Sequence, residues 1–197
     1  MNSHLPAAMH DKTLTELSAG LAAGAAMGAL IADRADFSQS ISLADLVKDV
    51  RVRDLSGLQL TMGGTTGVTK FRARSIVNSA VVLGERLASS VTLFDASGAN
   101  ITVGAIGSLV VKDDKNIPGD GDFRDTSRLQ LGGVVGVAKT LGSAKIPGTF
   151  EGVADISGAV GSFTAGNFLS TSWTATGTVG AIKAGGALDS VFGVGLG

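Results

Sequence analysis

The stretch AVGSFTAG at residues 159–166 recurs as TVGAIKAG at residues 178–185, so that the second copy starts 19 residues after the first. The match extends further along both copies, where Trp173 corresponds to Phe192. A short repeat that places Gly beside an apolar residue, and has no polar face of helical length, is typical of a β-solenoid. The sequence therefore predicts an all-β fold, a parallel β-helix with about 20 residues per coil.

The composition agrees with a single domain of this kind. The chain has 197 residues, of which 29 are Gly and only 3 are Pro. Gly is frequent where a chain turns every few residues, because it adopts positive φ without a Cβ clash. The 44% of hydrophobic residues and 17% of charged residues argue against intrinsic disorder, which needs the reverse balance.

Missing residue types exclude several kinds of site. The chain has no Cys, which excludes disulfides, thiolate metal sites and Cys nucleophiles. Its two histidines, His4 and His10, lie near the N-terminus, so the rest of the chain has none for a catalytic triad or a His-based metal site. The formal net charge of −1 gives no electrostatic reason to expect nucleic acid or an anionic membrane as a partner.

Two segments precede the predicted solenoid. We expect a disordered leader at residues 1–12 and, at residues 13–34, one α-helix that caps the open N-terminal end of the core. The residues in this second segment follow a helical apolar pattern, with Thr13 as candidate N-cap and Glu16 at the capping-box spacing.

Two other interpretations of residues 13–34 stay open. A transmembrane helix needs about 20 apolar residues, whereas the uncharged run at 17–32 contains 16. A secretory signal peptide begins with basic residues, whereas Asp11 and Glu16 precede this run and Lys12 is the only basic residue beside them.

Residues 40–197 have the pattern of a solenoid domain built from short strands. Apolar and polar residues alternate at 50–53, 58–62, 71–74 and 129–131, which predicts apolar side chains inside and polar ones outside. Equivalent positions of successive coils lie directly above one another in such a fold. The 19-residue repeat predicts the stacked pairs Val160–Val179, Phe163–Ile182 and Trp173–Phe192.

The C-terminal end of this domain has no polar cap. The segment VFGVGLG at residues 191–197 is apolar throughout. An uncovered coil exposes core residues and strand edges, with which another chain can pair. We expect another subunit, a further domain or a folded-back tail to cover it.

Residues 160–166 and 179–186, together with 106–112, resemble the Gly-rich short repeats of very large bacterial surface or secreted proteins, which are frequent in planctomycete-like genomes. Those repeats read roughly apolar-Gly-Ser-apolar-x-apolar-x-Gly, and the resemblance covers residues from about 46 to 197. It implies a right-handed parallel β-helix with a structural or adhesive role, and it brings no catalytic residues. This chain departs from the pattern in its N-terminal segment, its lack of a clear secretion signal and its small number of coils.

The segment 113–125 is the best candidate for a metal site. Ca²⁺ prefers six to eight oxygen ligands from a flexible loop, and Asp residues at alternate positions point two carboxylates the same way. A solvated polar loop is the alternative, because Lys112, Lys115 and Arg124 neutralise much of the charge and the EF-hand order is not met. The candidate calcium ligands are Asp113, Asp114, Asn116, Asp120, Asp122 and Asp125. No other cofactor is predicted.

Two short basic segments, at residues 51–53 and 72–74, lie on strands that we expect to be neighbours. If these strands stack, they form a basic patch that can hold a sulfated or carboxylated glycan. The alternative is an ordinary solvated strand face, on which Asp49 and Asp54 pair with the arginines. The candidate glycan-binding residues are Arg51, Arg53, Arg72 and Arg74.

These observations predict a non-enzymatic structural or adhesive module, which can associate end to end and lies at the cell surface or outside the cell. The main alternative is a β-helix that binds or cleaves polysaccharide. Cleavage needs carboxylates that converge on one bond, whereas the acidic residues here lie mostly on one loop, so no catalytic residue is assigned. A subunit of a phage fibre or similar assembly is a third interpretation.

Overall fold

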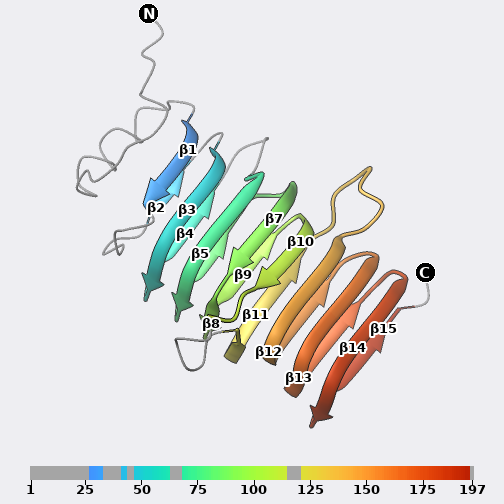
Figure 1. The fold of residues 1–197 in the computed structure, drawn as a ribbon. Helices are drawn as coiled ribbons and strands as arrows, with labels where there is room; N and C mark the ends of the chain where they lie inside the picture. Colours follow the sequence, from blue (N-terminus) through green and yellow to red (C-terminus); the bar gives the residue numbers. More distant parts are fainter. Residues whose placement is uncertain (1–26, 33–40, 44–46, 63–67, 115–120, 196–197) are drawn as a thin grey trace, which may run out of the picture.

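The computed structural model is a parallel β-solenoid (Figure 1). It describes residues 27–32, 41–43, 47–62, 68–114 and 121–195, to which the structural statements below refer. The strands stack side by side from β1 (Met27–Ala32) at one end to β14 (Val179–Leu188) and β15 (Val191–Val194) at the other (Figure 1). The predicted all-β solenoid with coils of about 20 residues is confirmed.

Three parallel ladders of strands run along the solenoid axis. The first ladder joins β1, β3 (Val47–Ser56), β5 (Lys70–Val77), β7 (Leu87–Leu93), β10 (Ala105–Val111) and the beginnings of β12 (Leu141–Ile156), β13 (Val160–Ala175) and β14. The second joins the ends of β3 and β5 to β8 (Asp95–Ser97), the start of β11 (Phe123–Leu131) and the middle of β12 and β13. The third joins β2 (Ile41–Leu43), β4 (Gln59–Met62), β6 (Ala80–Val82), β9 (Asn100–Val103), the ends of β11, β12 and β13, and β15.

The predicted stacking is confirmed, and aromatic side chains fill the C-terminal part of the core. The rings of Phe123 and Phe150 stack with centroids 5.0 Å apart, and Phe163 meets Phe150 edge-on at 5.2 Å. Phe163 also lies 6.1 Å from Trp173, and both side chains are fully buried. The register contains each predicted pair: Val160–Val179, Phe163–Ile182 and Trp173–Phe192.

The apolar-Gly-Ser motif has a structural cause in the first ladder. A Cβ added at Gly161 would lie 2.2 Å from the carbonyl oxygen of Gly142, and one added at Gly142 would lie 2.3 Å from that of Gly107. Only Gly therefore lets successive coils approach this closely at the beginning of β10, β12, β13 and β14. The apolar residue before the Gly faces the core, and the Ser after it faces outward.

A hydroxyl group recurs at the corner between the second and third ladders, directly after a residue with left-handed φ. Ser79 follows Asn78, whose φ is 45°. The Ser79 hydroxyl accepts a hydrogen bond from the Leu58 N–H of the preceding coil at 3.0 Å and donates one to the Val77 carbonyl at 2.8 Å. These bonds satisfy the buried hydroxyl and link two coils. The same arrangement is repeated by Ser127 with Ala99 and by Ser190 with Thr171.

The predicted capping helix at residues 13–34 is wrong, because the described residues contain no helix and residues 27–32 form β1. β1 pairs in parallel with β3, where Leu30 lies beside Val50 and is only 3% exposed. Pairing and burial outweigh the local helical propensity of this Ala-rich segment. The predicted leader and the remainder of the expected helix up to residue 26 lie outside the described residues. No helix in the described part of the chain is long and apolar enough to cross a membrane.

We predict that Phe163→Asp severely destabilises the C-terminal coils. The change replaces a fully buried ring with a carboxyl group and removes its contacts with Phe150 and Trp173. Truncating a buried Phe alone costs about 3–5 kcal/mol, and the buried carboxyl adds a desolvation penalty. Urea unfolding followed by Trp173 fluorescence measures the loss; a midpoint equal to that of the wild type would contradict the assigned core.

We predict that Gly161→Ala destabilises the protein by about 1–3 kcal/mol, the range for overpacking, because the added methyl group meets the Gly142 carbonyl at 2.2 Å. Gly132→Ala is the matched control, since a Cβ there has nothing within 4 Å. Thermal unfolding compares the two variants. Equal midpoints would show that close approach of the coils does not explain the motif.

Candidate functional site

Arg124, near the start of β11, lies among three acidic residues, Asp95, Asp122 and Asp125. Its guanidinium nitrogens lie 3.6 Å from Asp95, 3.5 Å from Asp122 and 3.7 Å from Asp125. The Asp125 carboxylate also accepts a hydrogen bond from the Ser97 hydroxyl of the preceding coil. These carboxylates therefore hold Arg124 and neighbouring coils in place.

Asp122 attaches the end of the 113–122 segment to the next coil. Its Oδ1 accepts a hydrogen bond from the Thr149 N–H at 2.7 Å. A Cβ added at Gly148 would lie 2.1 Å from the same oxygen, so the carboxylate packs directly against the backbone of β12. One oxygen of Asp122 is thus used by the backbone, and the other lies 3.5 Å from Arg124.

Four of the six predicted calcium ligands can be placed. Asp122 and Asp125 contact Arg124, whereas Asn116 and Asp120 lie outside the described residues. In the parts of the chain that the structure describes, no three acidic or His side chains form a group that could hold a metal ion. Calcium binding by this segment stays a prediction. The remaining two candidates, Asp113 and Asp114, come directly after the first ladder.

The structure brings the predicted arginines of β3 and β5 together. Arg51 and Arg72 are register partners in the first ladder. On β3, Arg51 pairs with Asp49 at 2.8 Å, and its neighbour Arg53 pairs with Asp54 at 3.2 Å. The solvated-face interpretation therefore describes β3 correctly, since both of its arginines have carboxylate partners.

The arginines of β5 differ from those of β3. Arg72 and Arg74 are exposed, and neither forms an ion pair within the described residues. Lys70, on the same strand, also faces outward and is exposed. Three cationic side chains at alternate positions of one strand lie about 6–7 Å apart from one to the next. The outward face of β5 therefore offers uncompensated positive charge.

Sequence reasoning missed a continuation of this patch through Phe94. The Phe94 N–H donates to the Arg74 carbonyl at 3.0 Å, which places the ring in the next coil along the ladder. The ammonium group of Lys112, one coil further, lies 5.7 Å from the centre of that ring. A cation over an aromatic face is attracted by the ring quadrupole. In the sequence, this continuation is indicated by Lys112, a cation that directly follows the apolar segment of β10.

A hollow at the corner between the third and first ladders differs from the basic patch in the residues that line it. Its walls are mostly apolar, and it contains none of the predicted site residues. A single carboxylate and a single guanidinium do not form a catalytic constellation. The side chains that line it include Met62, Glu85, Arg86, Val103, Val134 and Val135.

Comparison with protein-family models, with curated proteins and with solved structures finds no match for this chain. Of the resemblance to bacterial surface repeats, the structure supports the fold, a parallel β-solenoid of short repeats, whereas membership of that repeat family stays a prediction.

We predict that Asp122→Ala destabilises the protein by about 1–3 kcal/mol, the cost of leaving a polar partner unsatisfied. The change removes the acceptor of the Thr149 N–H and one partner of Arg124. Asp113→Ala is the matched control, because Asp113 is exposed. Chemical unfolding measures the stability of each variant, and repeating it with millimolar Ca²⁺ shows whether the ion stabilises the protein. Equal stabilities of the two variants would contradict the structural role of Asp122.

Proposed function

We propose that this protein is a non-enzymatic structural module of a bacterial surface or secreted protein, and that its C-terminal coil joins a second copy. The exposure of that coil carries the proposal. Phe192 and Val194 lie in register with the buried Trp173 and Ala175, yet they are 38% and 48% exposed. Among the described residues β14 and β15 pair only with β13, so their other edges present backbone groups to which another strand can bond.

The two ends of the described solenoid differ, which favours a particular geometry of association. At the other end, Leu30 faces the core and is only 3% exposed. A head-to-tail filament needs two complementary free ends, whereas a twofold contact uses the same surface of both copies. We therefore propose that two C-terminal coils meet about a twofold axis.

The composition of the C-terminal coil supports this contact. From Val179 to Val194 only Lys183 and Asp189 are charged. The cores of protein interfaces are depleted in charged residues and enriched in apolar ones. The exposed apolar side chains of this coil are Leu188, Val191, Phe192 and Val194.

We predict that the wild-type protein has the molar mass of a dimer by light scattering after size exclusion, and that Val194→Lys converts it to a monomer. The added ammonium group would be buried against its counterpart at the contact. Val135→Lys is the matched control, because Val135 is fully exposed on a turn away from this coil.

A wild-type monomer at all concentrations would contradict the proposed association, and an open-ended polymer would contradict the twofold contact. The measurement is repeated with millimolar Ca²⁺, which shows whether the 113–125 segment affects assembly.

Binding of an acidic polysaccharide is a second candidate function, favoured by the exposed Arg72 and Arg74 of β5. Guanidinium groups bind carboxylates in bidentate geometry. Retention of the protein on immobilised alginate, a carboxylated polysaccharide, tests it against neutral dextran. Loss of alginate retention in Arg72→Gln/Arg74→Gln is expected, and equal retention on both matrices would contradict this function.

A further inference from the structure

The outward side of the first ladder carries far more positive than negative charge. From β3 to β14, eight cationic side chains lie on this side, against two carboxylates, those of Asp49 and Asp54, which pair with Arg51 and Arg53. The whole chain has a net charge of −1, so the remainder of the molecule must carry an excess of acidic residues. We call this surface the basic face; its cations are Arg51, Arg53, Lys70, Arg72, Arg74, Lys112, Lys145 and Lys183.

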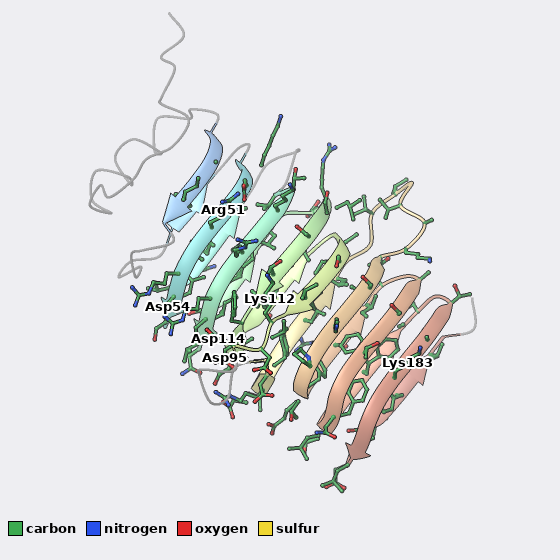
Figure 2. The ribbon with its side chains drawn as sticks, viewed as in Figure 1. Arg51, Asp54, Asp95, Lys112, Asp114 and Lys183 are labelled. Carbon is green, nitrogen blue, oxygen red and sulfur yellow. The ribbon has the colours of Figure 1, made fainter. Side chains whose placement is uncertain are left out.

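The basic face runs along the solenoid axis and not around one coil. Figure 2 shows Arg51, Lys112 and Lys183 following one another along the stack. Across the 113–122 segment the register still holds, because Val110 of β10 pairs with Lys145 of β12. In the same line of positions, Lys183 follows after Thr164. The cations therefore extend well beyond the predicted arginine patch.

A row of serine hydroxyls runs beside these cations. Ser108 pairs in register with Ser90 on one side and Ser143 on the other, and Ser143 pairs with Ser162. All four are half-buried, and none of their hydroxyls forms a side-chain hydrogen bond within the described residues. Hydroxyl groups spaced about 4.8 Å apart, one per coil, can bond a linear chain of hydroxyl-bearing units.

We propose that the basic face binds an extended carboxylated polysaccharide that lies along the solenoid axis. Its carboxylates contact the lysines and arginines, and its sugar hydroxyls contact the serine row. This inference rests on the second candidate function and extends its site from β3 and β5 to β14. A carboxylated sugar chain suits the face better than nucleic acid does, because positive charge is not continuous along it. At the register positions of Ser108 and Val110, β7 and β13 have only hydroxyl side chains. The hydroxyl-only positions are Ser90, Thr92, Ser162 and Thr164.

The test compares binding of alginate by the wild type and by two double variants at low salt. Lys145→Gln/Lys183→Gln removes two cations far from the predicted arginine patch. Two exposed ion pairs are together worth roughly a fivefold change in affinity, so we expect about that loss, which decreases as salt screens the charges. Ser143→Ala/Ser162→Ala is expected to weaken binding without changing its dependence on salt.

Arg128→Gln is the matched control, because Arg128 is an exposed cation of the third ladder that pairs with Asp155 at 2.6 Å. It is expected to bind alginate as the wild type does. Circular dichroism and thermal unfolding show whether each variant keeps the fold.

Three outcomes would overturn the proposal. Binding that is lost in Arg72→Gln/Arg74→Gln but unchanged in Lys145→Gln/Lys183→Gln would confine the site to the arginine patch and leave the second candidate function intact. Equal binding of alginate and neutral dextran would contradict that function as well. Tighter binding of double-stranded DNA or dextran sulfate than of alginate at equal salt would assign the face to another polyanion.

Discussion

Hydrogen bonding of each coil to the next is the interaction on which the rest of this structure depends. A coil of about 20 residues cannot bury its own inward side chains, so its core exists only between neighbours. Parallel pairing places each residue beside the equivalent residue of the adjacent coil, as it does for Phe163 and Ile182. The glycines at 142 and 161 permit this contact, because a side chain there would meet a backbone carbonyl.

The C-terminal part of the fold could be predicted from sequence because its repeat is uninterrupted. Residue pairs such as Trp173 and Phe192 follow directly from the 19-residue spacing, and the structure has the same pairs. The N-terminal part could not be predicted in this way. Leu30 lies in an Ala-rich segment with a helical pattern, and its partner Val50 belongs to a coil that does not share the repeat. Tertiary pairing there outweighs local propensity.

The candidate sites show the same division between local and long-range information. Strict alternation at residues 71–74 was enough to place Arg72 and Arg74 outside, where the structure has them. The alignment of Lys145 with Val110 crosses a long intervening segment, and no local pattern indicates it. The acidic segment 113–125 was identified from its composition, but the contact of Arg124 with Asp95 joins two coils and no local pattern indicates it.

The number of residues in a coil can vary at its corners without changing how the strands pair. Ile106 pairs with Leu141, whereas Leu141 pairs with Val160, so the first interval is much longer in sequence although both pairs are adjacent in space. Part of the additional length, residues 132–140, lies at the corner between the third and first ladders, and the chain returns in register at β12. Such corners are natural positions for grafting a foreign peptide, since the strands on either side fix both of its ends. Sequence variation in solenoids of this kind would accordingly accumulate as corner loops of different lengths, while the ladders stay the same.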